Sequence, residues 1–241
     1  MLEWLLAPLD ASRAHDVSGL LAWHARVMTL AWGILAPCGI LAARFLKLWP
    51  GQKWPARLDH PGWWHLHRAC QYLAGALTLL GLGLILGRQS RGGISGAHQL
   101  VGWSLIVLAV VQFASAWLRG SKGGPTAPAP DGSWRGDHYD MTPRRIAFEY
   151  IHKFGGYAAM LFAIVAVLMG LWQANAPRWM WLAISGWWVG CLIAFAWLQR
   201  RGYAFDTYQA HWGTNTMHPG NRRAPIGFGI RRQASETMKE G

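Results

Sequence analysis

Residues 154–176 read FGGYAAMLFAIVAVLMGLWQANA, a stretch without a single Asp, Glu, Lys or Arg. A helix needs about 20 mostly apolar residues to cross the hydrocarbon core of a bilayer, so this run predicts a membrane-spanning helix. Four further runs also lack charged residues. The first of them is too short to span by itself, and extending it back through Trp23 and His24, with Arg26 at the interface, brings it to full length. The sequence therefore predicts an all-α integral membrane protein with five transmembrane helices. The four further uncharged runs are Val27–Ala43, Ala69–Gly87, Gly92–Leu118 and Trp179–Gln199.

The overall composition agrees with this prediction and excludes an ordinary soluble enzyme. Of the 241 residues, 52% are hydrophobic and only 14% are charged, whereas a soluble domain carries about a quarter charged residues. The formal net charge is +12. Because Lys and Arg are confined to segments between the uncharged runs, this charge does not indicate nucleic-acid binding. The three cysteines fall in separate predicted helices, so we expect packing residues and not a disulfide framework.

The distribution of Lys and Arg predicts the orientation of the chain. If the five helices alternate in direction, one side of the membrane carries five of these residues and the other carries 18. Excess positive charge in short loops stays in the cytoplasm, so we expect the N-terminus outside and the C-terminus inside. We expect residues 1–17 at the outer surface, a four-helix core over 18–176 with an irregular loop at 120–143, a fifth helix over 177–201 and a tail over 202–241. The aromatic residues of the tail leave docking on a partner or on the helices themselves open.

Histidines at matching depths in the first four helices are the most informative residues. His24, His67, His98 and His152 each lie about one turn inside the N-terminal end of a predicted helix. Since consecutive helices are antiparallel, His24 and His98 share the outer side, and the other two share the inner side. A haem iron takes axial ligands from both faces of the macrocycle, and two facing helices of a bundle can supply them. The four histidines therefore predict two bis-histidine haems, one near each membrane face.

Small residues near these histidines support the same hypothesis. A flat macrocycle needs room one turn along the helix, and Gly102 and Gly156 follow the histidines of the third and fourth helices by four residues. The corresponding positions of the second and first helices carry Gln71 and Met28. Any one histidine taken alone could instead satisfy a polar group at the interface.

Basic residues gather near the predicted inner pair. They would balance the haem propionates or attract an anionic donor, or else they fix the topology at the lipid headgroups. The remaining histidines lie outside this pattern, and we expect His138, His211 and His218 to be solvated. The basic residues are Arg44, Arg68, Arg145 and Lys153.

Four separated segments carry motifs that occur together in one protein family. Residues 24–45 read HARVMTLAWGILAPCGILAARF, residues 63–71 read WWHLHRACQ with an aromatic-x-x-His-x-x-x-Gln pattern, and residues 96–102 read GAHQLVG. The fourth segment holds Arg145, Phe148, His152, Gly156 and Tyr157. In order and spacing these segments resemble the four core helices of the cytochrome b561 family, especially its DOMON-linked members, over about Ser18–Trp172.

The resemblance implies two non-covalent haems b, ligated by the pairs His24–His98 and His67–His152, and electron transfer across the membrane. We also expect a bacterial inner membrane, with the N-terminus in the periplasm. Because both axial positions of each iron are filled, the chemistry is expected to be outer-sphere. No DOMON domain precedes the helices, so we expect the soluble donor of that subfamily to be missing or to be a separate protein. Glu149 stands where the family commonly has Asn.

Two other functions stay open at this point. A quinol-linked cytochrome b subunit serving a partner redox protein would share the haems but use a lipid-facing pocket. A non-haem membrane anchor or assembly protein would use the histidines only to satisfy polar groups. The expected partners are membrane lipid and an electron donor and acceptor, either small molecules such as ascorbate or proteins, with homodimerisation left open. We assign no catalytic residue. Whether the chain is an enzyme, namely an electron-transfer oxidoreductase, is left open.

Overall fold

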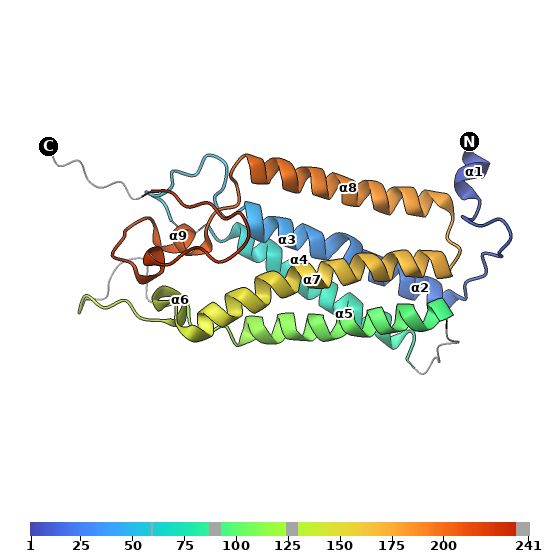
Figure 1. Ribbon diagram of the computed structural model, residues 1–241, viewed down its shortest axis with the longest axis horizontal. Coiled ribbons are helices and arrows are strands. Elements are labelled where there is room, and N and C mark those ends of the chain that lie inside the picture. Colours follow the sequence, from blue (N-terminus) through green and yellow to red (C-terminus); the bar gives the residue numbers. More distant parts are fainter. Residues whose placement is uncertain (59, 87–92, 124–129, 235–241) are drawn as a thin grey trace. The chain divides into compact units, whose positions relative to one another are not determined.

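The computed structural model describes residues 1–58, 60–86, 93–123 and 130–234 (Figure 1). Within these residues it consists of helices and connecting segments without a strand, so the predicted all-α class is confirmed. The helical elements are α1 (Leu2–Leu6), α2 (Gly19–Met28), η1 (Thr29–Leu35), α3 (Ala36–Phe45), α4 (Gly62–Gly83), α5 (Gly93–Trp117), α6 (Asp137–Asp140), α7 (Pro143–Gln173), α8 (Arg178–Arg200), α9 (Thr207–Trp212) and η2 (Pro219–Arg222).

Four helical stretches among the described residues are long and apolar enough to cross a membrane: Gly19–Phe45, Gly96–Trp117, Pro143–Gln173 and Arg178–Arg200. The first joins α2, η1 and α3. Large apolar side chains on these stretches face outward, as in Leu192, which is 67% exposed. Outward apolar side chains along whole helices suit lipid as the surrounding solvent. The protein is therefore an integral membrane protein, as predicted.

The helix α4 does not reach the same hydropathy as the other four stretches. Its first half carries two histidines, Arg68 and Gln71, and these polar side chains lower the mean hydropathy of the helix. The described part of the helix ends at Gly83, and residues 87–92, which close the predicted run, lie outside the described residues. The fifth span therefore stays a prediction.

By its internal contacts the chain divides into two units. The first unit comprises Met1–Ile40, His67–Ala109 and Tyr157–Ala196, and the second comprises Leu41–Leu66, Val110–Gly156 and Trp197–Gly241. The helices α3, α4, α5, α7 and α8 each contribute residues to both units.

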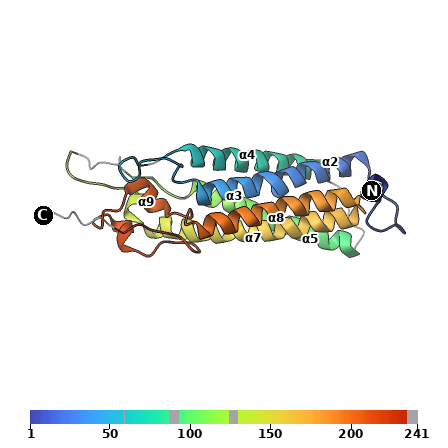
Figure 2. The same cartoon turned by 90° about the horizontal axis from the view of Figure 1, so that it is seen from above.

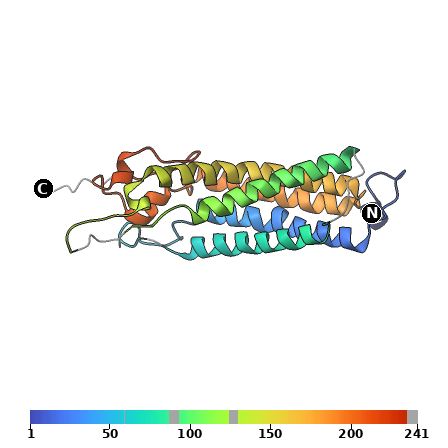
Figure 3. The ribbon, with the colours of Figure 1, turned by 90° about the horizontal axis from the view of Figure 1, so that it is seen from below.

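Small residues bring the helices of the first unit together. Leu105 of α5 packs against Ala159 and Ala163 of α7, which are 3% and 1% exposed, and α4 lies along α2 and α3 (Figures 2 and 3). The π-helical turn η1 contains Gly33, whose carbonyl accepts hydrogen bonds from the indole nitrogens of Trp187 and Trp188 in α8. A π-helical turn changes the backbone hydrogen-bond pattern, and these indoles satisfy the carbonyl in a region without water.

The N-terminal segment is tied to the turn between α7 and α8, within the first unit. The buried Asn175 accepts a hydrogen bond from the Asp10 backbone N–H and donates to the carbonyls of Asp10 and Arg13. Its backbone lies in the left-handed region with φ 45°, where Asn is tolerated better than most residues. These bonds give residues 1–17 a specific docking place on the chain itself.

The tail packs on the chain itself, which is one of the two possibilities that the sequence left open. In the second unit an aromatic cluster joins the loop before α7 to α9, and the Tyr208 hydroxyl donates to the Tyr139 carbonyl at 2.7 Å. The buried members of the cluster are Tyr139, Met141, Tyr208, Trp212 and Ile226, with Trp134 and Ile146 packed against them.

The expectations of an irregular loop at 120–143 and of solvated His138 and His218 need correction. The loop contains the short helix α6. His138 and His218, expected to be solvated, are 2% and 9% exposed because they pack among the rings of the aromatic cluster. Such packing depends on residues about 70 positions apart in the chain and leaves no periodic signal in the sequence.

Candidate functional site

The structure brings His24 and His98 together in the first unit. Each is the sixth residue of its helix, α2 and α5, so both lie about one and a half turns from a helix start. The two imidazole rings have their centroids 6.4 Å apart, with ring planes at 85°. The Nδ1 atom of His24 lies 2.8 Å from the carbonyl oxygen of Gly81 in α4. This pair was predicted from helix direction and depth alone.

Glycines border this histidine pair. Nothing lies within 4 Å of where a Cβ atom on Gly102 would be, so the space beside His98 on α5 is open. A Cβ atom on Gly170 of α7 would lie 3.4 Å from Cε1 of His98. Gly170 is not among the residues predicted from the sequence. Its position 14 residues after Gly156, close to four full helical turns, was the signal that could have found it.

His67, also the sixth residue of its helix, lies against α3 in the first unit. Its Nδ1 atom is 2.9 Å from the Gly39 carbonyl oxygen. One turn further along α4, the side-chain nitrogen of Gln71 donates to the Ala36 carbonyl at 3.2 Å and packs directly on Gly39. Gln71 thus contacts the backbone of α3, and a side chain at Gly39 would displace it.

Two of the four predicted ligands therefore share one arrangement, in which Nδ1 faces a glycine carbonyl of a neighbouring helix. A carbonyl only accepts, so Nδ1 carries the proton and Nε2 of the neutral ring keeps its lone pair. That tautomer is the one that a metal-bound histidine commonly adopts. His15 makes a similar bond to the Ala174 carbonyl but is exposed and lies outside the membrane spans. His24 combines this bond with a position inside a candidate span, and His67 combines it with a position inside the long helix α4.

His152 lies in the second unit, where Gln112 of α5 holds its turn of α7. With the Gln112 amide turned so that both of its ends are satisfied, the nitrogen donates to the His152 carbonyl at 2.9 Å and lies 3.0 Å from Nδ1. The amide oxygen then accepts from the Gly156 backbone N–H at 3.3 Å. The His152 ring stacks on Phe148 at 5.1 Å. His67 belongs to the first unit and His152 to the second, so the pairing of these two stays a prediction.

A buried carboxylate organises the basic residues of α7. Glu149 is 4% exposed and forms ion pairs with Arg145, at 2.9 Å, and with Lys153. These positions are four residues apart, so all three side chains lie on one helix face. Glu149, noted above as a departure from the family pattern, thus neutralises part of the charge of two predicted site residues.

Backbone carbonyls of the tail accept hydrogen bonds from the basic residues of the second unit. Lys153 donates to the Ile226 carbonyl at 2.7 Å, and Arg44 donates to the Phe228 carbonyl at 2.5 Å and to the Gln199 side chain. Arg68, in the first unit, is exposed and lies over the ring of Tyr72. Arg44 and Lys153, predicted to serve a haem or an anionic donor, therefore have partners within the chain.

Lys47 gives this region a pH dependence that can be measured. It is 6% exposed and donates to the carbonyls of Arg44 and Phe205. Burial, with Lys153 and Arg44 acting in the same direction and Asp206 and Glu149 opposing them, lowers the pKa of Lys47 to about 7. The unfolded chain keeps this proton up to its ordinary pKa, so the unfolded state binds more protons between the two values and stability rises with pH there.

We therefore expect Lys47→Met to flatten the rise in unfolding temperature between pH 7 and pH 10. The comparison with the unsubstituted chain at each pH removes the contribution of other titrating groups. Lys53→Met, an exposed lysine of the same unit, serves as the control. Parallel curves for Lys47→Met and the unsubstituted chain would show that Lys47 is not the group responsible.

Comparisons with known proteins show which family the chain belongs to. The chain is 32% identical over 198 residues, 80% of its length, to the cytochrome b561, DM13 and DOMON domain-containing protein of Arabidopsis thaliana. It is 31% identical over 168 residues, 68% of its length, to ferric-chelate reductase 1 of Bos taurus. The chain belongs to the cytochrome b561 family. This confirms the family predicted from the four segments.

The cytochrome b561 relatives are longer than this chain. It spans 20% of the first Arabidopsis protein, 24% of the bovine one and 32% of a cytochrome b561 and DOMON domain-containing protein from Arabidopsis, to which it is 27% identical over 176 residues. No family model and no solved structure matches the chain. Because these relatives come from a plant and a mammal, they do not support placement in a bacterial inner membrane, and only the coarser placement in a membrane stands.

Proposed function

We propose that this cytochrome b561 family chain transfers electrons across the membrane through two b-type haems, each ligated by two histidines. The ligand pairs are His24 with His98 and His67 with His152. The observation that carries the proposal is the facing pair His24 and His98 on α2 and α5. The family membership and the names of the relatives support the same chemistry.

The geometry of the outer pair fits a shared metal. A metal–imidazole bond is about 2 Å long and the bonding nitrogen lies about 1 Å from the ring centre, so two imidazoles on opposite sides of one metal have centroids about 6 Å apart. The separation of His24 and His98 is 6.4 Å. The Nδ1 contact of His24 leaves Nε2 as its ligating nitrogen, and the open space at Gly102 would admit a macrocycle.

For the inner pair, separate observations on His67 and on His152 support the proposed ligation. His67 has its Nδ1 atom against the Gly39 carbonyl, which favours ligation through Nε2. His152 has its orientation restrained by Gln112 and Phe148. Ligation of His152 through Nε2 would place the proton on Nδ1, so the Gln112 amide would then have to present its oxygen, and not the nitrogen described above, to that atom. Arg145, Lys153 and Arg44 would supply positive charge for haem propionates, shared with Glu149 and the tail carbonyls.

In this proposal the protein residues serve mainly to position the two haems and to insulate them from their surroundings. Bound haem would supply an iron that cycles between the ferric and ferrous states. One electron leaves a reductant at one face and reaches an oxidant at the other, so the donor is oxidised and the acceptor reduced by one electron each. We propose an ascorbate-type or protein donor. The relative named ferric-chelate reductase suggests a ferric chelate as acceptor.

We further propose that α4 is the fifth span and that the C-terminus is cytoplasmic. With 22 residues α4 is about 33 Å long, enough to cross a hydrocarbon core of about 30 Å. The 18 basic residues assigned to the side of the tail, against five on the other side, support this orientation.

Proteoliposomes test the proposed electron transfer. The purified chain is reconstituted into vesicles that enclose ferricyanide, and ascorbate is added outside. We expect bleaching of the enclosed ferricyanide, with one electron lost by ascorbate for each ferricyanide reduced, and no bleaching in protein-free vesicles. Bleaching only after a quinol is added to the bilayer would favour the quinol-linked alternative. A chain that takes up no haem under conditions that load a known b-type cytochrome would overturn the proposal.

A second test uses the space at Gly102. We expect Gly102→Leu to lower the haem content by up to one haem per chain, because the added side chain would occupy the space of the macrocycle. Gly186→Leu in α8 is a matched control, since a Cβ atom there also meets nothing within 4 Å. The measurement is the haem-to-protein ratio of both purified variants. Equal haem contents in the two variants would contradict a macrocycle beside Gly102.

A further inference from the structure

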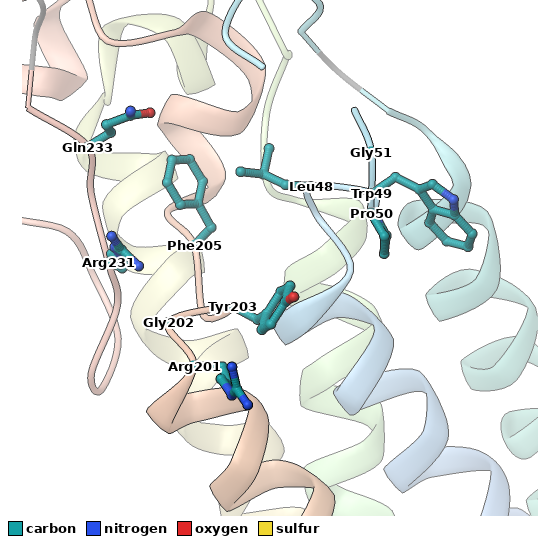
Figure 4. Close-up of a pocket in the computed structure, with 10 residues that line it drawn as sticks. All are labelled: Leu48, Trp49, Pro50, Gly51, Arg201, Gly202, Tyr203, Phe205, Arg231 and Gln233. Carbon is teal, nitrogen blue, oxygen red and sulfur yellow. The ribbon is translucent and has the colours of Figure 1, made fainter. Parts of the chain in front are cut away.

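A cavity in the second unit lies where two predicted spans end. It has a volume of about 390 Å³ and is lined by the segment that follows α3 and by the segment that follows α8 (Figure 4). The spans Gly19–Phe45 and Arg178–Arg200 end three residues before Leu48 and one residue before Arg201, respectively. Residues that directly follow a span lie at the level of the lipid headgroups.

Two arginine side chains line this cavity. Arg201 and Arg231 both line it, and a Cβ atom on Gly202 would lie 2.5 Å from Nη1 of Arg231. The Arg231 side chain therefore lies against the residue next to Arg201. Gly202 has φ +78°, a conformation that favours glycine. The backbone of Arg231 is held in place because its N–H donates to the Ala204 carbonyl and its own carbonyl accepts from the Asp206 N–H.

The side chains of these arginines have no anionic partner in the part of the chain that the structure describes. None of the ten lining residues is acidic. Asp206, next to the cavity residue Phe205, is 4% exposed and forms its ion pair with Arg232. The Arg201 guanidinium lies over the Trp197 ring, a contact that uses none of its N–H donors. Two positive charges at one cavity without a counter-ion favour binding of an anion.

Aromatic side chains complete the cavity. Trp49 and Tyr203 line it and are 48% and 41% exposed, while Phe205 forms a buried wall. Trp and Tyr are enriched at the membrane–water interface, where one part of the ring meets apolar chains and the other meets water. Paired arginines beside interfacial aromatic rings match a phosphate joined to an acyl-bearing glycerol.

We propose that this cavity binds the phosphoryl headgroup of an anionic phospholipid through Arg201 and Arg231. Guanidinium groups bind phosphate oxygens by paired N–H donors, and Trp49 and Tyr203 pack against the glycerol region. A free phosphate offers the same oxygens to the arginines, so the experiment separates the two sources. The site is independent of the haem ligands, and its occupation does not depend on the proposed electron transfer.

The test measures lipid binding to the purified full chain in detergent by native mass spectrometry. The probes are dioctanoyl phosphatidylglycerol and dioctanoyl phosphatidylcholine. The cavity variant is Arg201→Gln with Arg231→Gln, and the control is Arg57→Gln with Arg223→Gln, which removes two exposed charges of the same unit outside the cavity. Each basic residue near a membrane surface contributes about 1 kcal/mol, so we expect phosphatidylglycerol to bind the cavity variant ~30-fold more weakly.

The control variant should bind phosphatidylglycerol as the unsubstituted chain does, and Arg201→Lys with Arg231→Lys should recover part of the affinity. Equal weakening in both Gln variants, or equal binding of the two lipids by the unsubstituted chain, would overturn the proposal. Binding of inorganic phosphate that depends on both arginines, without binding of phosphatidylglycerol, would assign the cavity to a soluble phosphate and overturn the lipid assignment. Unfolding temperatures of all variants show that they are folded.

Discussion

Substitution of His98 by alanine is expected to remove one of the two proposed haems, leaving about one haem per chain. Its ring lies 6.4 Å from that of His24, and a bis-histidine haem that loses one ligand is either released or becomes five-coordinate. The measurement is the haem-to-protein ratio of the purified variant, with its reduced-minus-oxidised spectrum. A high-spin signal from a retained haem also meets the expectation.

Double variants test the pairing itself. His24→Ala with His98→Ala should lose no more haem than either single variant, because both residues serve one haem. His98→Ala with His152→Ala should lose both haems. Non-additivity within a pair and additivity between pairs identify partners without any assumption about distance. His15→Ala, in an exposed histidine outside the spans, is the control. Loss of both haems in the His24 and His98 double variant, with each single variant losing one, would contradict the pairing.

Removal of the Glu149 carboxylate is expected to destabilise the chain by about 3 kcal/mol. Glu149 is 4% exposed and is the ion-pair partner of Arg145 and Lys153. Glu149→Ala would leave two positive charges at a site with little water, and an unpaired buried charge costs more than the pair contributes. The measurement is the unfolding temperature in detergent, which should fall clearly below that of the unsubstituted chain.

A compensated variant distinguishes charge from packing at this position. Glu149→Leu combined with Arg145→Leu and Lys153→Met removes the unpaired charges, so its stability should recover much of the loss. Asp131→Ala, an exposed carboxylate in the same unit, is the control and should change the unfolding temperature little. If Glu149→Ala and the control behave alike, the ion pairs contribute little to stability.

The lengths of the helices show where hydropathy stops being informative. The uncharged run at residues 154–176 predicted a span, whereas α7 begins at Pro143, and α4 begins at Gly62 and not at Ala69. The additional turns carry charged and polar side chains that bond along or between helices, as Arg145, Glu149 and Lys153 do. His67 and His152 lie on these additional turns, which is why the run boundaries alone do not contain them.

The all-helical membrane class, the cytochrome b561 family and the facing of His24 and His98 were predictable from the sequence. These properties follow from local composition, helix periodicity and helix direction, which depend on residues close together in the chain. Other contacts appear only when the chain is folded: Gly81 and Gly39 accept from the histidines, the tail carbonyls accept from Arg44, Lys47 and Lys153, and Arg201 and Arg231 line one cavity. Those contacts join backbone groups and side chains that are far apart in sequence. Every residue type carries the same backbone carbonyl, so the sequence does not show which carbonyl will accept a hydrogen bond.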